Sequence, residues 1–456
     1  MARTTKKKPA LTPEEKLEQA LVPEAEQPYK VPENWCWVNW GSVGDFIAGS
    51  GFKNEYQGFT GYEIPFYKVG SLKNSDASGL IYAFSNTINE EIRSKLKATL
   101  IPPNSILFAK IGEAIKLNRR SVNRIACCID NNMMAFVPKC VMRYAFYWSC
   151  GIDLYDYTNA TTVPAIRKSD LEAIPFPLPP LPEQHRIVTR IESLFAKLDE
   201  AREKAQAVVD GFEDRKAAIL HKAFTGELTE GWRRQNGLDF SSTWKNCSLG
   251  EYADNQYGYT EKSSHEAIGP KFLRITDIQD GQVSWGDVPY CKIDEELKSK
   301  YTLNVGDIVV ARIGATTGKS YMVIDDVDAV YASYLIRVSV FRKDGLTSKY
   351  LYHYLQCPMY WQQITELSSG IAQPGVNGKK LKTLKLPIPT IEEQNQIVLI
   401  LDQLIPIERQ AVDSAEQVLD QIDTMKKSIL ARAFRGELGT NDPEEESAVE
   451  LVRRVL

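Results

Sequence analysis

The chain repeats itself, and this duplication constrains its fold more than any other feature of the sequence. Residues 164–228 align with residues 374–438 at a constant offset of 210, without a gap and with 21 identities in 65 positions. Upstream the similarity is weaker but keeps its order, as in Ala109-Lys110-Ile111-Gly112 and Ala311-Arg312-Ile313-Gly314. Because a fixed period indicates repeated structural units, the sequence predicts two similar units of about 200 residues. Each unit is a diverged body followed by a better-preserved helical segment.

Both helical segments have the apolar spacing of a coiled coil. Apolar residues recur at alternating steps of four and three, which places them on one helix face. The predicted seam consists of Ile187, Ile191, Leu194, Leu198, Ala201, Ala205 and Val208 in the first helix and Ile397, Leu401, Leu404, Ala411, Ala415 and Val418 in the second. The first pattern slips at Arg215. In the second helix Glu408 occupies a seam position, and Pro406 is expected to kink or interrupt the helix.

We expect the two helices to pair with each other, because both carry a seam of the same kind. With a body before each helix, antiparallel pairing places the two bodies at opposite ends, related by a pseudo-two-fold axis. Pairing between two molecules and burial within a globular core are the alternatives. The predicted fold class is α+β, with two mixed, mostly β bodies separated by two long antiparallel helices that form a coiled coil.

Short apolar runs that follow turn signals predict strands in both bodies. Residues 105–109 follow Pro102-Pro103-Asn104, and residues 307–311 follow a turn at 304–307. Short helices are expected around 143–150 and 347–361. The predicted segments are a polar N-terminal extension (1–30), the first body (31–182), the first helix (183–228), the second body (229–392), the second helix (393–438) and an acidic tail (439–456).

Composition excludes several classes of protein. No apolar stretch approaches the roughly 18–20 residues of a membrane helix, and the first ten residues lack the apolar core of a secretory signal. The eight cysteines include no Cys-x-x-Cys pair, which argues against a disulfide framework and a zinc site and favours the reducing cytoplasm. The sequence therefore predicts a cytoplasmic protein that binds no membrane and no metal.

No catalytic constellation is recognisable. The stretch from Gly314 to Ser320 has three residues between its glycines, whereas a phosphate-binding loop needs four and a following helix. We expect it to form a tight turn that presents Lys319 before a further strand. The four histidines have no metal-ligand spacing. The chain is therefore not expected to be an enzyme, although an enzyme that acts on nucleic acid unaided stays an alternative.

Local charge indicates candidate contacts to DNA. The net charge of the chain is only −4, but residues 110–124 carry five basic residues against one acidic residue. Such density can neutralise phosphates, and arginine can also bind guanine edges. Aromatic-polar loops could place side chains into a groove. The candidates are Lys110, Lys116, Arg119, Arg120 and Arg124 in the first body and Gln256, Tyr257, Tyr259, Arg312 and Lys319 in the second. For each of them an ordinary folding or solvated role is the alternative.

The motifs at the ends of the bodies and helices resemble a known family. Each body ends in Pro-Leu-Pro-Pro-Leu-Pro-Glu-Gln (177–184) or Pro-Ile-Pro-Thr-Ile-Glu-Glu-Gln (387–394), and each helix ends in Ala-Phe-x-Gly-Glu-Leu. This combination resembles the DNA-specificity subunit of type I restriction-modification systems, from about Val31 to Leu438. The first 30 residues and the acidic tail lie outside the resemblance.

The resemblance implies that each body is a target recognition domain that reads one half of a split, double-stranded DNA target. It implies that the helices act as a spacer and as a docking surface for two modification (methyltransferase) subunits, which restriction (translocase and nuclease) subunits join in phage defence. Adenine methylation and ATP-dependent cleavage then belong to the partners, which would bind S-adenosylmethionine, ATP and Mg²⁺, and this chain would bind no cofactor. A coiled-coil scaffold without a DNA role is the alternative.

Overall fold

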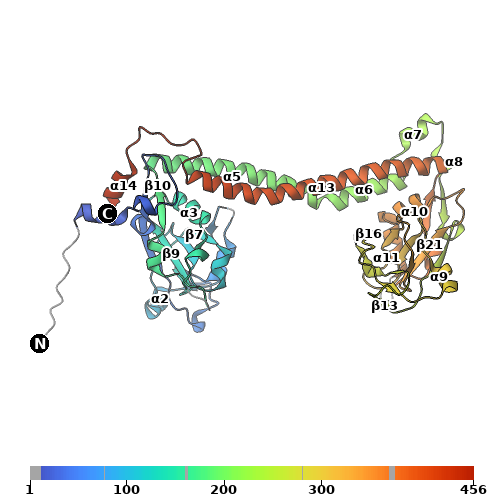
Figure 1. Ribbon diagram of the computed structural model, residues 1–456, viewed down its shortest axis with the longest axis horizontal. Coiled ribbons are helices and arrows are strands. Elements are labelled where there is room, and N and C mark those ends of the chain that lie inside the picture. Colours follow the sequence, from blue (N-terminus) through green and yellow to red (C-terminus); the bar gives the residue numbers. More distant parts are fainter. Residues whose placement is uncertain (1–11, 77, 160–162, 280, 369–374, 456) are drawn as a thin grey trace. The chain divides into compact units, whose positions relative to one another are not determined.

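The computed structural model describes residues 12–76, 78–159, 163–279, 281–368 and 375–455, and it divides into two compact units (Figure 1). The first unit contains the chain up to Glu203 together with the residues from Val418 onward, and the second contains Lys204–Gln417. Each unit therefore combines one body, the beginning of the helix that follows it, and the end of the other copy's helix.

The body of the first unit is built around a five-stranded sheet with the order β2-β9-β6-β7-β4. A three-stranded sheet, β5-β3-β8, and the pair β1-β10 complete it. The strands are β1 (Cys36–Asn39), β2 (Gly44–Ala48), β3 (Ile64–Tyr67), β4 (Leu80–Ile81), β5 (Thr87–Ile88), β6 (Ile106–Ala109), β7 (Arg120–Asn123), β8 (Cys128–Ile129), β9 (Met133–Pro138) and β10 (Pro175–Leu178). The helices are α1 (Pro13–Ala20), α2 (Glu90–Leu96), α3 (Met142–Gly151), α4 (Lys168–Glu172), most of α5 (Leu181–Asp210), the end of α13 and α14 (Ala448–Val455).

The second body repeats this plan. Its main sheet has the order β12-β21-β18-β19, which matches β2-β9-β6-β7, and β13-β17-β14-β20 forms a second sheet beside the pairs β11-β22 and β15-β16. The strands are β11 (Lys245–Ser248), β12 (Ala253–Tyr257), β13 (Ser263–Ser264), β14 (Lys271–Leu273), β15 (Ile278–Gln279), β16 (Gln282–Val283), β17 (Tyr290–Cys291), β18 (Ile308–Ala311), β19 (Ser320–Met322), β20 (Ala329–Tyr331), β21 (Leu335–Val340) and β22 (Lys385–Ile388). The helices are α6 (Phe212–Phe224), α7 (Glu230–Gln235), α8 (Phe240–Thr243), α9 (Glu295–Tyr301), α10 (Ser348–Tyr354), α11 (Pro358–Ser368), α12 (Gly378–Lys382) and the larger part of α13 (Ile391–Ala433).

The predicted strands and short helices are confirmed. The apolar runs become β6 and β18, whose residues are all buried at the centre of the main sheets. The helix expected around 143–150 is α3, whereas the one expected over 347–361 is divided into α10 and α11. The turn before β19 is held by main-chain hydrogen bonds from Thr317 to Gly314 (3.0 Å) and from Lys319 to Thr316 (2.9 Å), so it is the tight turn that the sequence predicts and not a phosphate-binding loop.

A two-stranded pair closes each body at the point where its helix begins. β1 pairs antiparallel with β10, Cys36 opposite Leu178, and β11 pairs with β22, Lys245 opposite Ile388. β10 and β22 contain the prolines of the repeated motif, which a strand tolerates at a sheet edge. The first strand of each body is thereby joined to the strand that leads into its long helix.

The two long segments pair antiparallel within each unit, as predicted. In the first unit Lys426 donates to Asp199 (2.6 Å) and Arg202 pairs with Asp423, so residue numbers rise on α5 as they fall on α13. In the second unit the apolar side chains of α6 and of the start of α13 share one core; these are Leu220, Ala223 and Phe224 with Ile397, Val398 and Leu401.

The structure corrects the predicted seam of the second helix. Ala411 and Val418 are exposed, Val418 to 41%, while Val412 is only 3% exposed and Leu419 is half-buried. After Glu408 the next buried residue of the second helix is Val412, four positions further on, and not Ala411, three positions further on, as expected. Apolar residues stand at both alternatives, so only packing against the partner helix selects between them. The predicted seam of α5, from Ile187 to Val208, is buried or half-buried throughout.

The two charged residues that interrupt the apolar seam, Arg215 and Glu408, form an ion pair with each other. Arg215 donates from Nε to Oε2 of Glu408 (2.7 Å) and from Nη2 to the carbonyl of Val208 (2.9 Å). The hydrogen bond to Val208 gives this carbonyl a donor near the break between α5 and α6. The sequence did not predict this break. A Cβ on Gly211, at this break, would lie 2.6 Å from Nη1 of Arg215, so a larger residue there would force the guanidinium to shift. α13 is continuous through Pro406, so of the predicted kink or interruption the interruption is wrong and the kink stays a prediction.

The described parts of both chain ends belong to the first unit. Asn34 donates to the carbonyl of Asp442 (2.9 Å), and Arg186 binds both carboxylate oxygens of Glu445 (2.7 and 2.8 Å). Ala448 and Val452 of α14 are buried in the core of this unit. Residues 12–30 and 439–455 are therefore packed segments of the first unit, and residues 1–11 of the predicted extension lie outside the described residues.

Candidate nucleic-acid interface

One surface of the first body is assembled from the ends of its strands. The main-chain nitrogen of Lys110, directly after β6, donates to the carbonyl of Asn132 (2.8 Å), and its carbonyl accepts from the nitrogen of Ile166 (2.9 Å). Ile111 forms an antiparallel bridge with Ala165. The end of β6, the turn before β9 and the segment before α4 therefore lie together. We name this set the first strand-end surface, residues 110–112, 131–132 and 163–168.

The second body builds the same surface from equivalent positions. The main-chain nitrogen of Arg312 donates to the carbonyl of Tyr334 (3.0 Å), and its carbonyl accepts from the nitrogen of Val376 (2.9 Å). Ile313 bridges Gly375, as Ile111 bridges Ala165. Lys110 and Arg312 are thus equivalent positions on two copies of one surface. The second strand-end surface comprises residues 257–258, 312–314, 333–334 and 375–379.

An arginine stacked on an exposed tyrosine dominates the second strand-end surface. The guanidinium carbon of Arg312 lies 5.0 Å from the centroid of the Tyr257 ring, and the Tyr257 hydroxyl accepts a hydrogen bond from the nitrogen of Gly378 (2.9 Å). Tyr334, beside them, is 58% exposed. A planar guanidinium held on a ring can bind a phosphate or the acceptor edge of guanine.

The first strand-end surface is also basic but carries different side chains. Lys110 is half-buried, and Arg167 and Lys168 are exposed next to it. Lys168 lies 3.5 Å from Glu172, an exposed pair one helical turn away. The equivalents of Tyr257 and Tyr334 in this body are Ala48 and Asn132, by the matched pairing of β2 with β9 and of β12 with β21. The two copies therefore share a backbone frame and differ in chemistry.

Arg120 is not a surface contact, contrary to the prediction. Its side chain is only 7% exposed, with the guanidinium 5.4 Å from the Phe108 ring and donating to Oδ1 of Asn118 (2.9 Å). Burial lowers the pKa of Arg120 to about 10, because desolvation disfavours its charged form. The charge density that suggested a phosphate site includes a residue that points into the body.

The other basic candidates of the first body differ in their distance from the strand-end surface: Lys116 and Arg119 lie near the end of β6, whereas Arg124 lies away from it. Lys116 is exposed but forms an ion pair with Glu113 (2.7 Å), and this contact raises the pKa of the lysine. Arg119 is exposed on the turn before β7, and Lys319 occupies the equivalent turn before β19. Arg124 lies at the opposite end of β7 from this turn, with its guanidinium 5.1 Å from the exposed ring of Tyr82. The antiparallel pairing of β6 and β7 separates Lys110 from Arg124.

Residues 256 and 257 belong to β12 and not to the predicted loop, and of the three candidates at 256–259 only Tyr257 joins the interface. Gln256 accepts a hydrogen bond from Nη2 of Arg337 (2.5 Å), which ties it to the sheet. Tyr259 is half-buried with its ring 5.4 Å from that of Tyr301. Both therefore have packing roles.

Sequence reasoning missed the segments before α4 and α12. Arg167, Lys168, Asn377 and Lys379 reach the strand-end surfaces only because the bridges Ile111–Ala165 and Ile313–Gly375 fold these segments back. The basic pair Lys379-Lys380 after Gly378 was a visible signal in the sequence, whereas its proximity to Arg312 was not.

The repeated Glu-Gln pair of the family motif is structural. Glu183 and Glu393 are fully buried and accept hydrogen bonds from the indole nitrogens of Trp35 (2.7 Å) and Trp244 (3.0 Å). The amide nitrogens of Gln184 and Gln394 donate to the carbonyls of Pro179 and Pro389 (2.9 and 3.0 Å), which directly follow β10 and β22. The motif therefore fixes the start of each long helix to its body and contributes no exposed group to the interface.

A family model for the type I restriction modification DNA specificity domain matches the chain twice, over residues 32–208 and 241–417. Each match covers one body and the first part of the helix that follows it. Within the described residues, the helices are too short or too polar to cross a membrane.

Curated relatives match most of the chain. The chain is similar to the type I restriction enzyme EcoBI specificity subunit of Escherichia coli, with 28% identity over 297 residues that span 62% of each protein. It is 23% identical over 432 residues to the EcoKI specificity subunit of Escherichia coli strain K12, covering 90% of each. It is 24% identical over 435 residues to the MjaVIII specificity subunit of Methanocaldococcus jannaschii, covering 90% of this chain and 94% of the relative.

Two solved structures share the fold. The HsdS subunit from Thermoanaerobacter tengcongensis aligns with a TM-score of 0.63 and 21% identity, over 91% of this chain and 100% of that one. A chain from a study of complex assembly and conformational transition of the type I R-M system aligns with a TM-score of 0.65 and 20% identity, over 90% and 100%. None of these similarities supports a scaffold without a DNA role.

Proposed function

This chain belongs to the family of type I restriction-modification DNA-specificity subunits, and we propose that it reads a split DNA target, one half-site with each body. The reading would direct adenine methylation and restriction by partner subunits, while this chain itself is the non-catalytic member of the complex. The two matches of the family domain support one recognition domain in each unit.

The observation that carries the proposal is the strand-end surface, which both bodies build on equivalent backbone positions with different side chains. Lys110 and Arg312 occupy the same position after the central strand, and Asn132 and Tyr334 the same turn. Because the protein backbone is equivalent in both bodies, each body would dock on its half-site in the same way. Contacts to the DNA backbone would fix the register of the protein on the duplex. Different side chains at that frame would then select different bases.

We propose that the partners are two modification subunits and the restriction subunits that join them. S-adenosylmethionine, ATP and Mg²⁺ would bind to these partners. The low net charge of the bodies supports this division of labour: residues 34–182 carry +3 and residues 229–390 carry +1. Because counterion release supplies most non-specific DNA affinity, such bodies should bind DNA weakly alone and more tightly within the complex.

The proposed function is tested by mapping N6-methyladenine in cells with the modification subunits, with and without this chain. The expected result is a split motif that is methylated only when the chain is present. Exchanging the second body for that of another specificity subunit should change one half of the motif and leave the other unchanged. Methylation that is independent of the chain, or a change in both halves, would contradict the proposal.

A longer helix pair is expected to widen the gap between the half-sites. Four residues added to each long helix lengthen it by about 6 Å, which corresponds to about one or two base pairs at roughly 3.4 Å per pair. The measurement is the gap in the methylated motif. Four residues inserted at Gly237, in the connection between α7 and α8, are the matched control and should leave the gap unchanged. An unchanged gap in the helix variant would refute the spacer role.

Replacing Arg312 with alanine is expected to weaken specific DNA binding by the assembled complex by about 1–3 kcal/mol, the range of a good base contact. The variant removes the guanidinium stacked on Tyr257 and leaves the backbone frame in place. Arg342→Ala is the control, because Arg342 also lies 5.0 Å from a tyrosine ring, that of Tyr252, but is exposed and lies outside the surface, whereas Arg312 is half-buried. Electrophoretic shift on target duplex distinguishes them, and equal losses would remove Arg312 from the interface.

A further inference from the structure

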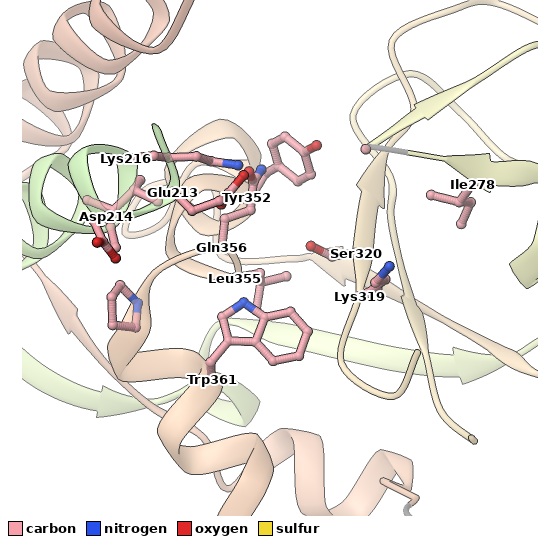
Figure 2. Close-up of a pocket in the computed structure, with 14 residues that line it drawn as sticks. Glu213, Asp214, Lys216, Ile278, Lys319, Ser320, Tyr352, Leu355, Gln356 and Trp361 are labelled. Carbon is pink, nitrogen blue, oxygen red and sulfur yellow. The ribbon is translucent and has the colours of Figure 1, made fainter. Parts of the chain in front are cut away.

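The second unit contains a groove of about 550 Å³ that lies outside the second strand-end surface, and Lys319 is the DNA-contact candidate that lines it. It lies between α6, α10, the start of α11 and the turn before β19 (Figure 2). Leu220 and Leu355 form an apolar floor and are each 1% exposed, and the half-buried indole of Trp361 forms one wall. The other lining residues are Glu213, Asp214, Lys216, Ala217, Ile278, Gly281, Lys319, Ser320, Tyr352, Gln356 and Pro358.

The first unit has an arginine side chain at the equivalent place. Arg120 stands opposite Phe108 in the pair β6-β7, and Ser320 stands opposite Val310 in the equivalent pair β18-β19. The buried guanidinium of Arg120 lies against the Phe108 ring and donates to Asn118. Where the first body supplies its own guanidinium, the second has a serine.

The helices behind the two positions are equivalent as well. Tyr144 of α3 donates to the carbonyl of Pro177 (2.7 Å), and Tyr350 of α10 donates to the carbonyl of Pro387 (2.8 Å). This match places Ile152, whose carbonyl accepts from the Asn118 amide beside Arg120 (2.8 Å), at the position of Pro358 in the groove. Arg120 therefore stands in the first unit at the sheet position that Ser320 holds beside the groove in the second.

Ser320 leaves a polar group without a partner in this space. Its hydroxyl oxygen is buried and, among the described residues, has no hydrogen-bond partner. A buried hydroxyl that lacks a partner is unfavourable, so a ligand that opens the packing around Ser320 would gain a favourable contact there.

We propose that this groove binds an arginine side chain presented by a partner protein. A guanidinium is planar and weakly hydrated, so it can stack on the Trp361 indole above an apolar floor. Glu213 and Asp214 line the α6 side and can accept its hydrogen bonds (Figure 2). Lys216 and Lys319 balance the negative charge of the two carboxylates, so the lining of the groove carries no net charge. This favours an arginine with an acidic neighbour over an isolated cation. The proposal does not depend on DNA recognition.

The test uses the full chain with 5-fluorotryptophan in place of tryptophan and the fluorine resonance of Trp361, assigned through Trp361→Phe. The probes are two blocked tripeptides, acetyl-Glu-Arg-Gly-amide and acetyl-Glu-Lys-Gly-amide. The arginine peptide is expected to shift the resonance saturably and to bind at least about tenfold more tightly than the lysine peptide, because only guanidinium combines stacking with a hydrogen-bonding fork. No shift, or equal affinities, would overturn the proposal.

Two variants locate the site. Ser320→Arg places at the groove the side chain that the first unit has at the equivalent position, and it should fill the groove from within and abolish the response. The exposed pair Glu213→Gln and Asp214→Asn removes both carboxylates without touching the core and should weaken binding about tenfold, the scale of a charge-assisted hydrogen bond. Glu230→Gln, an exposed carboxylate of α7 outside the groove, is the control. Binding that survives both groove variants, or falls equally in the control, would place the peptide elsewhere and refute the proposal.

Discussion

Replacing Glu393 with alanine is expected to destabilise the second unit by about 3–5 kcal/mol, the cost of leaving one partner of a buried ion pair alone. The Glu393 carboxylate is fully buried and accepts from Arg233 (2.5 Å), from the Thr229 hydroxyl (2.6 Å) and from the Trp244 indole (3.0 Å). Arg233 is only 6% exposed, so the variant leaves a guanidinium in the interior without its counter-charge. Equilibrium unfolding in urea, followed by fluorescence, measures the loss.

The duplication supplies a matched control at Glu183. This carboxylate is equally buried and accepts from Trp35 (2.7 Å) and Asn441 (2.8 Å), but within the described residues it forms no ion pair. Glu183→Ala should therefore cost less, about 1–3 kcal/mol for unsatisfied hydrogen-bond donors. A loss at Glu183 equal to or greater than that at Glu393 would contradict the importance of the buried charge pair.

Replacing Arg215 and Glu408 together with leucine is expected to give methylated motifs with more than one gap length. A polar pair within an apolar seam specifies register, because every slipped register leaves its charges unpaired. An all-leucine seam would remove this constraint without a loss of stability. A slip of one heptad displaces the helices by about 10 Å, or about three base pairs of DNA. The measurement is the distribution of gaps in the methylome.

The control for this variant is the exposed pair Arg409 and Asp413 on the same helix, which lie 3.2 Å apart. Leucine at both of these positions leaves the seam intact and should leave one gap length. A single, unchanged gap in the Arg215 and Glu408 variant would show that apolar packing alone sets the register. A single, changed gap would mean that the pair selects between two discrete registers, which would also contradict the expected mixture.

The long helices and their pairing were predictable because a repeat and a heptad pattern are local properties of the sequence. The register of the second helix was less predictable, because residues 411 and 412 are both apolar and either could continue the seam. The break at Gly211 was missed, since a single glycine in an amphipathic run is an ordinary feature until Arg215 packs against it. Pro406 removes one hydrogen bond, but Leu401 and Ile405 hold that turn of the helix against the second body.

The candidate interface could be predicted only in part. Lys110 and Arg312 were named from local charge and repeat position, and both lie on the strand-end surfaces. Arg120 has the same charge and lies within the same stretch, yet it is buried, because all four residues of β7 are buried and neither face of this strand meets solvent. Charge density along the chain does not say which strands are covered on both faces.

By itself, the sequence determined that this protein is a duplicated pair of β-rich bodies on long paired helices, because periodicity and repetition are written along the chain. Only the tertiary structure decided which charges meet and which are exposed: the partnership of Arg215 with Glu408, the burial of Arg120, and the groove beside Ser320 in the second unit. Such contacts join residues that are distant in the chain, and their geometry depends on how strands and helices pack.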